Sequence, residues 1–191
     1  MPTIIALFVG LGVSLALGLW TAWLAVRSPS PIDAITFGAW QAWPNAGTDV
    51  ADPYSRARLA RSGEIPLGSG EGLALLAQTD DAGAPLTARC DYRIAGQTPP
   101  ARLWTLTLED AAGRVLSEGD EVAAIGGDVI LRGPDGSFEI VLSRTPKPGN
   151  WISPDAAERF RIIIRLYDTT ARGATGVSTL TMPRIVRERC A

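Results

Sequence analysis

The N-terminal part of the chain carries a long run without a charged residue. All 23 residues from Ile4 to Val26 are uncharged, and most are apolar. At about 1.5 Å per residue a helix of this length measures roughly 34 Å, more than the roughly 30 Å of a bilayer's hydrocarbon core. Trp20 and Trp23 lie near its end, where aromatic side chains favour the membrane interface, and Arg27 follows. The pattern predicts a transmembrane helix over residues 4–26.

A cleaved signal peptide is the alternative interpretation of this run. Signal peptides have a basic first segment, a shorter apolar stretch and a cleavage site with small residues. Only the α-amino group is positive here, and Ser28 and Ser30 each precede a proline, which we expect to hinder cleavage. The sequence therefore favours an uncleaved anchor. Within it, Gly10, Ser14 and Gly18 share one helix face and are candidates for contact with another membrane helix.

After residue 34 the pattern changes to short stretches in which apolar and polar residues alternate. In residues 101–110, for example, Thr105 and Thr107 alternate with Trp104, Leu106 and Leu108. Such alternation is typical of strands with one buried face. Comparable stretches cover residues 34–44, 72–80, 89–96, 128–144 (a hairpin around 133–136), 159–168 and 179–190. The last contains a proline, which predicts an edge strand.

One soluble helix interrupts this series of strands. Asp52 can cap free backbone N–H groups, Pro53 suits a first helical position, and Gly63 suits a helix end, so we expect a helix from Pro53 to about Ser62. The predicted fold is an all-β, jelly-roll-like antiparallel β-sandwich behind a single transmembrane helix. The segments are a tail (1–3), the membrane helix (4–26), a proline-stiffened linker (27–34) and the sandwich (35–191).

Composition excludes several classes of chemistry. The net charge of −2 gives no general attraction to nucleic acid. The chain has no His, which removes the common Ser-His and Cys-His catalytic arrangements, and two Cys alone do not form a zinc site. No phosphate-binding or dinucleotide-binding motif is present. We expect no metal, no cofactor and no nucleic-acid partner.

Several stretches resemble a known family. They are DPYSRARLARSGEIPLG, PPARLWTLTLED, DGSFEIVLS, GNWISP and RLYD, and the resemblance extends over about residues 38 to 168. They are similar to short membrane-anchored bacterial proteins, of α-proteobacterial type, in the domain of unknown function 1214 family. The resemblance implies an all-β, jelly-roll-like domain and no established activity.

The two cysteines bear on the side of the membrane that the domain occupies. A bond between Cys90 and Cys190 would tie the C-terminal strand to the sheet and persist in an oxidising compartment. The alternatives are two separate thiols in a cytoplasmic domain, or a bond between chains. Arg27 alone favours a cytoplasmic domain. The cysteines outweigh it, so we predict a single-pass protein of the bacterial inner membrane with its domain in the periplasm.

Four residues are candidates for ligand binding. Tyr54 and Arg56 on the predicted helix suit a carboxylate or phosphate, and Asn150 and Trp151 in a predicted loop suit a sugar. For each pair a structural role is favoured over ligand binding: Arg56 would cap polar groups of the sandwich, Tyr54 would pack, and Trp151 would fill the end of the sandwich. A hydrolase that uses carboxylates would need a pair of them. Candidates are Asp91, Glu109, Asp110 and Asp168, but no spacing among them in the sequence is diagnostic of such a pair.

Three classes of function follow from these observations. The favoured one is a tethered, non-catalytic interaction or accessory module of the cell envelope, whose partners are the bilayer and either an envelope protein or a second copy joined through the membrane helix. The alternative is a module that binds a glycan or small anion. A carboxylate hydrolase is the least favoured.

Overall fold

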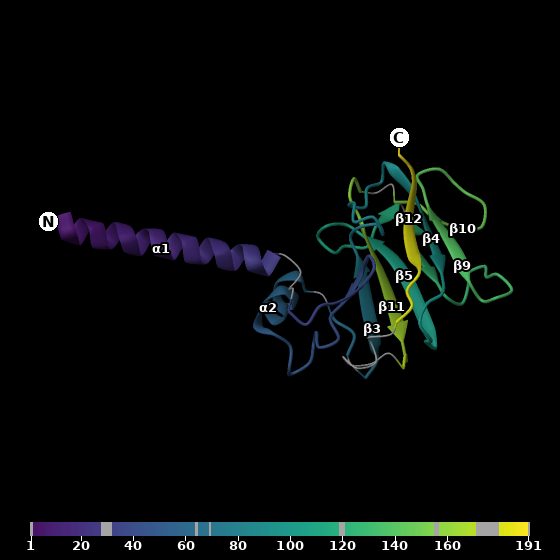
Figure 1. Cartoon of the computed structure of the whole chain (residues 1–191), viewed down its shortest axis with the longest axis horizontal. Helices are drawn as coiled ribbons and strands as arrows, with labels where there is room; N and C mark the ends of the chain where they lie inside the picture. The colour runs from purple at the N-terminus through teal and green to yellow at the C-terminus, as the bar shows by residue number, and fades with distance from the viewer. Residues whose placement is uncertain are drawn as a thin grey trace.

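A computed structural model describes residues 2–27, 32–63, 65–68, 70–118, 121–154, 157–170 and 180–190. The N-terminal helix α1 (Pro2–Arg27) extends away from the β-rich domain (Figure 1). It is long and apolar enough from Pro2 to Val26 to cross a membrane, and its most apolar part is not buried against the protein. The structure thus confirms an apolar helix over this run, whereas its insertion in a membrane stays a prediction. The predicted segment limits stay predictions, and linker residues 28–31 lie outside the described part of the chain.

Helix α2 (Pro53–Ser62) forms where the capping residues predicted it. Asp52 Oδ1 accepts hydrogen bonds from the backbone N–H groups of Tyr54 (2.9 Å) and Ser55 (3.1 Å). Gly63 ends the helix with φ 68°, a left-handed conformation that glycine adopts without steric cost. Local sequence therefore fixes both ends of α2.

A six-stranded antiparallel sheet forms one layer of the domain. Its strands, in spatial order, are β1 (Ile35–Phe37), β2 (Trp40–Ala42), β3 (Gly72–Ala77), β11 (Arg161–Tyr167), β5 (Leu103–Glu109) and β8 (Ala124–Gly126). In β11, Ile162, Ile164 and Leu166 face the core, as the alternation predicts. Ile163 breaks that alternation and is nevertheless buried, because the outer face of this sheet is also covered by protein.

A four-stranded sheet forms the second layer. Its order is β10 (Asn150–Ile152), β9 (Phe138–Leu142), β4 (Cys90–Gly96) and β12 (Arg184–Cys190), and a separate small hairpin contains β6 (Ser117–Glu118) and β7 (Glu121–Val122). Strand β12 begins after Pro183 and lies at the edge, as expected. The expectation of purely antiparallel sheets was wrong for β10, which runs parallel to β9.

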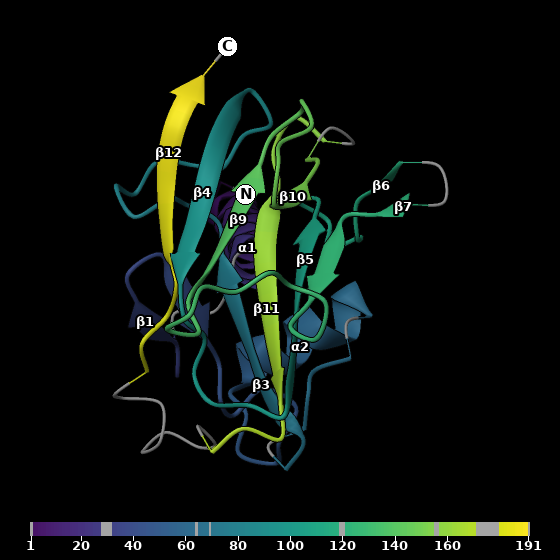
Figure 2. The same cartoon turned by 90° about the vertical axis from the view of Figure 1, so that its right-hand side faces the viewer.

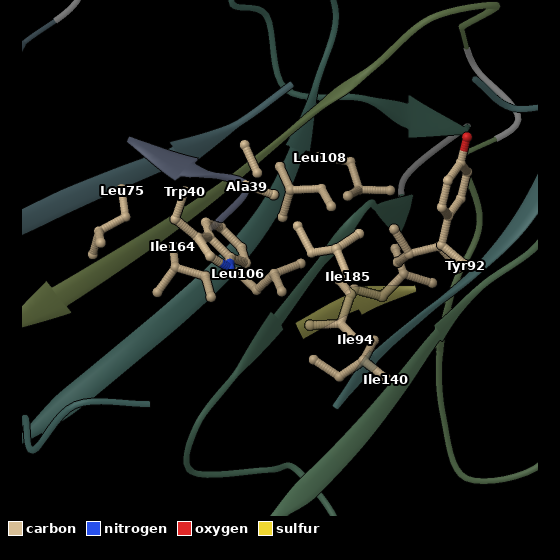
Figure 3. Packing of buried hydrophobic residues seen from close by; sticks show 14 of the residues in the cluster. Ala39, Trp40, Leu75, Tyr92, Ile94, Leu106, Leu108, Ile140, Ile164 and Ile185 are labelled. Atoms are coloured by element: carbon tan, nitrogen blue, oxygen red, sulfur yellow. The ribbon is translucent and has the colours of Figure 1, made fainter. Parts of the chain in front are cut away.

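The two sheets share one hydrophobic core. Figure 3 shows Leu106 and Ile164 of the six-stranded sheet near Ile94, Ile140 and Ile185 of the other, and all five are fully buried. Burial of such side chains from both layers supplies the main favourable free energy of folding. The structure is therefore mostly β, with two principal sheets around a common core.

The hairpin predicted over residues 128–144 was only partly right. Its second half is β9, but the first half pairs only through a single bridge from Arg132 to Phe138. The reason lies in Asn150, whose side chain hydrogen-bonds both the N–H and the C=O of Leu131. Those backbone groups are therefore not available for a strand ladder.

Candidate functional site

The two sheets differ in what covers their outer faces. On the six-stranded sheet, Leu76 and Ile163 point outward yet are buried, because α2 and the segments around it lie over them. On the four-stranded sheet, the outward-facing Glu139, Val186 and Glu188 are exposed. Figures 1 and 2 show that this second sheet lies on the side of the domain remote from α1. The exposed face is thus directed away from the predicted membrane anchor.

A groove crosses this exposed face. It consists of two adjoining depressions of about 660 Å³ and 420 Å³, which share Glu139, Val141 and Pro148 in their walls. Leu131 forms part of the first depression and is 65% exposed. An exposed apolar side chain in a concave surface is a common feature of binding sites. We call this surface the groove.

Asn150, a predicted sugar contact, shapes the groove. Its Nδ2 donates to the carbonyl oxygens of Leu131 (2.9 Å) and Glu139 (2.8 Å), and its Oδ1 accepts from the N–H of Leu131 (2.8 Å). Both amide protons are therefore used within the protein. Asn150 lines the first depression and holds the Leu131 segment against β9 and β10.

Trp151, the second predicted sugar contact, is also held by the protein. It is paired with Val141 in the parallel ladder, so both side chains lie on the outer face of the sheet. Its Nε1 donates to the carbonyl oxygen of Ser143 at 2.8 Å, and the side chain is half-buried. The indole N–H is therefore used inside the fold.

Charges of opposite sign are balanced along the groove. Those in its walls are three acidic residues, Asp91, Glu139 and Glu188, and three basic residues, Arg132, Lys147 and Arg189. Arg93, on the same sheet face, lies 2.9 Å from Glu188 and 3.8 Å from Glu139. A surface with this balance favours neither polyanions nor polycations.

Asp91 is the central charge at one end of the groove. Its Oδ2 lies 3.2 Å from Arg189 Nη2 and 3.4 Å from Lys147 Nζ. Burial raises the pKa of Asp91, but the hydrogen bonds with Ser143, Arg189 and Lys147 outweigh that effect and hold it below the ordinary 3.8. Asp91 is therefore a negative charge that links β4 to Arg189 of β12 and to the segment after β9 that contains Ser143 and Lys147.

The predicted disulfide is present and fixes this end of the groove. It joins Cys90 to Cys190, 100 residues later in the chain. The same register places Arg189 opposite Asp91, after a bulge that follows Arg187. The bond therefore holds β12 in place beside β4.

The structure separates the two predicted ligand-binding pairs. Tyr54 and Arg56 lie on α2, on the side of the six-stranded sheet, whereas Asn150 and Trp151 belong to the other sheet. Arg56 Nε donates to the carbonyl oxygen of Ala51 at 2.9 Å, and its Nη2 also donates to that of Asp49. Arg56 thus caps the loop before α2, while Tyr54 remains exposed.

The carboxylates considered for hydrolysis are each paired with arginine and do not form one site. Asp91 pairs with Arg189, Glu109 with Arg161 and Arg165, Asp110 with Arg114, and Asp168 with Arg102. Among the described residues no group of three or more His, Cys, Asp or Glu side chains is placed to hold a metal ion.

Sequence reasoning missed the groove itself. Its wall comes from β4, β9, β12 and the start of β10, together with the loops that precede β9 and β10. The signal in the sequence was the charged residues at alternate positions of β4, Asp91 and Arg93, and the charged residues 187–189 of β12. Alternation shows which residues share a face but not which strands become neighbours.

Comparison with known families identifies the domain. Residues 71–171, more than half of the chain, match the family described as "Protein of unknown function (DUF1214)". The chain belongs to this family. The match runs from the start of β3 to just beyond β11, so it includes strands of both sheets and most of the groove, but neither β1 and β2 nor β12. The family assignment that the sequence suggested is confirmed.

Two solved structures are similar to this DUF1214 protein. The VPA0106 protein from Vibrio parahaemolyticus superposes with a TM-score of 0.58 at 19% identity, over 73% of this chain and 36% of that chain. A putative uncharacterized protein from Burkholderia cenocepacia is 21% identical over 76% of this chain and 46% of its own, with a TM-score of 0.38. This chain thus spans less than half of either protein. None of the curated proteins compared with it matches.

Proposed function

We propose that this DUF1214 protein is a membrane-tethered interaction module of the bacterial cell envelope, and that the groove receives its partner. The observation that carries the proposal is the uncovered, concave outer face of the four-stranded sheet, on the side remote from α1. An anchor on one side leaves the opposite side accessible. No catalytic step is required for this role.

The proposed location is the inner membrane, with a single span and the domain in the periplasm. The apolar helix α1 supports the tether. The bond between Cys90 and Cys190 supports an oxidising compartment, because thiol pools keep such bonds reduced in the cytosol. Arg27, which directly follows the span, is the one charge that favours a cytoplasmic domain instead.

The way in which the two sheets pack is also inferred. We infer a jelly-roll-like β-sandwich, in which the two sheets pack face to face around the shared core. The single hydrophobic cluster with members from both sheets supports this, as do the largely antiparallel pairings.

We propose that the partner is a protein segment of mixed charge. The balanced charges of the groove suit such a segment, and the exposed Leu131 together with Val141 offers it apolar contact. A glycan is the less favoured ligand, because the indole N–H of Trp151 and both amide protons of Asn150 are already used.

The membrane helix is a second candidate contact for a partner. Ser14 Oγ donates to the carbonyl oxygen of Gly10, so its hydroxyl does not extend far from the helix surface. A Cβ added at Gly10 or Gly18 would meet nothing within 4 Å, so this small-residue face is uncovered within the chain. We propose that it packs against another copy or against a partner's membrane helix.

Site-specific photocrosslinking tests the groove. A photoreactive amino acid replaces Leu131 in the full-length protein, expressed in its bacterial host, and a second variant carries it at Val115. Val115 is the control, since it is an exposed apolar residue (44%) that pairs with the end of β5, away from the groove. We expect a discrete adduct from position 131 that position 115 does not give.

The mass of that adduct identifies the partner. The sum of two copies would indicate self-association, and any other mass is assigned by mass spectrometry and tested by reconstitution with the purified partner. Identical adducts from both positions, or none from position 131, would contradict the groove as the binding surface.

Protease treatment of spheroplasts tests the location. We expect externally added protease to cleave the domain, and the released fragment to change its electrophoretic mobility with reductant. A protected domain with free thiols would place it in the cytoplasm instead.

A further inference from the structure

A small cleft lies beneath α2, on the opposite side of the domain from the groove. Its volume is about 60 Å³. Leu59 of α2 and Leu67 form one side, and Ile163 of β11 lies on the other. A water needs roughly 10–15 Å³ measured in this way, so the cleft has room for a molecule of a few non-hydrogen atoms.

The charged side chains in the wall of this cleft are both basic. They are Arg58 of α2 and Arg161 of β11, and no acidic side chain of the described residues lines the cleft. Arg58 is half-buried, with its guanidinium carbon 5.6 Å from the centre of the Trp43 ring. Among the described residues Arg58 has no carboxylate partner and no hydrogen bond, so its donors are free for a ligand.

Arg161 is held rigidly and retains a free donor. Its side chain is 12% exposed, and its Nε (3.0 Å) and Nη2 (2.6 Å) both donate to Glu109 Oε2. Its Nη1 makes no hydrogen bond within the described part of the chain. Because Nε and Nη2 hold the guanidinium in place, its Nη1 is preorganised to donate to an anion.

The surroundings of Arg161 carry an excess of positive charge. Arg165 Nη2 also bonds Glu109, at Oε1 (3.1 Å), so two arginines share one carboxylate. The side chain of Glu109 is 3% exposed and that of Arg165 is 25% exposed. A positive charge that is largely removed from water favours a bound counter-anion.

We infer that the cleft binds a small monocarboxylate, with its carboxylate between Arg58 and Arg161 and a short hydrocarbon chain against Leu59 and Leu67. The two arginines supply the charge complement, and the apolar walls select a ligand with a hydrocarbon part over a simple inorganic anion. The inference is independent of the proposed interaction role, because the groove lies on the other sheet.

Thermal unfolding of the full-length protein in detergent, monitored by tryptophan fluorescence, tests this site. Sodium butyrate, neutral butyramide and inorganic phosphate are titrated separately, with chloride keeping the ionic strength constant. We expect butyrate to raise the melting temperature in a saturable way, since a ligand that binds only the folded state stabilises it. Butyramide and phosphate should have little effect.

Two variants of α2 locate the binding site. Arg58→Gln removes a guanidinium from the cleft, whereas Arg61→Gln removes an equally basic, exposed residue of the same helix that does not line it. Loss of a charge-assisted hydrogen bond should weaken butyrate binding about tenfold or more in Arg58→Gln. Binding to Arg61→Gln should match the unmodified protein.

The other outcomes overturn the inference in different ways. A butyramide effect equal to that of butyrate would show that charge is not recognised. A stronger effect of phosphate than of butyrate would replace the monocarboxylate with an inorganic oxyanion. No saturable effect of butyrate, or equal losses in both variants, would remove the site. None of these results bears on the crosslinking at position 131.

Discussion

At the scale of single residues, Glu109 is a charged side chain buried inside the domain. Its carboxylate is almost completely buried and accepts hydrogen bonds from two arginines of the neighbouring strand β11. Its position at the end of β5 could be read from the sequence. That both arginines would reach it from β11 depended on strand pairing, since Arg161 lies directly opposite Glu109.

Glu109→Gln should therefore destabilise the protein. The substitution leaves two largely buried guanidinium groups without their carboxylate, and removing one partner of a buried ion pair costs about 3 kcal/mol or more of unfolding free energy. Urea unfolding followed by tryptophan fluorescence measures the loss. Glu158→Gln is the control, because its pair with Arg89 is exposed on both sides and should contribute about 0–1 kcal/mol. Similar losses in both would refute the buried role.

Asp91 gives a prediction about pH. A carboxylate whose pKa is lower in the folded than in the unfolded protein stabilises above its ordinary pKa, here 3.8, and this stabilisation disappears as the pH falls through the lowered value. The free energy of unfolding should therefore fall less steeply with acidification below 3.8 in Asp91→Asn than in the unmodified protein. Urea unfolding at neutral pH and at several acidic values measures the two slopes, and equal slopes would contradict the assignment.

At the scale of elements, α2 is the part of the domain that local chemistry specifies best. Its first and last residues follow from Asp52, Pro53 and Gly63 alone. The strand that was expected before β9 shows the opposite case, because the alternation at residues 129–131 was overridden by a side chain 19 residues later. Local pattern decides an element only where no tertiary hydrogen bond competes for its backbone.

Asp52→Ala should weaken α2. Two backbone N–H groups at its start lose their acceptor, which costs about 1 kcal/mol of unfolding free energy. Asp52→Asn is the matched control, because an asparagine side chain also caps a helix and should retain most of the stability. Urea unfolding of the two variants separates capping from charge, and an equal loss in both would show that the charge dominates.

At the scale of the whole molecule, the bond between Cys90 and Cys190 links the C-terminal strand to the sheet. Replacing both cysteines with serine should lower the unfolding free energy by about 2–5 kcal/mol, because the unfolded chain gains the freedom that a closed loop of this size denies it. Urea unfolding with and without reductant measures this. Reductant should destabilise the natural protein and leave the double variant unchanged, whereas insensitivity of the natural protein would contradict a structural role.

The arrangement of the whole molecule also gives the groove its direction. The covered sheet faces α2 and the open sheet faces away from α1 (Figures 1 and 2). Nothing in the alternation of a single strand distinguishes these two sheets. The difference arises because the segment between β2 and β3 folds over only one of them.

The amino-acid sequence alone determined the apolar helix, both ends of α2, the main strands and the family, and it favoured the pairing of Cys90 with Cys190 over separate thiols or a bond between chains. These depend on hydrophobic periodicity, capping chemistry and the number of cysteines, which are local or countable properties. The tertiary structure decided the parallel pairing of β10, the shape of the groove, the burial of Glu109 between two arginines and the cleft beneath α2. All of these except the pairing of β10 with β9 join residues that are distant in the chain. Strand order, strand direction and burial, which periodicity does not encode, determine which residues meet.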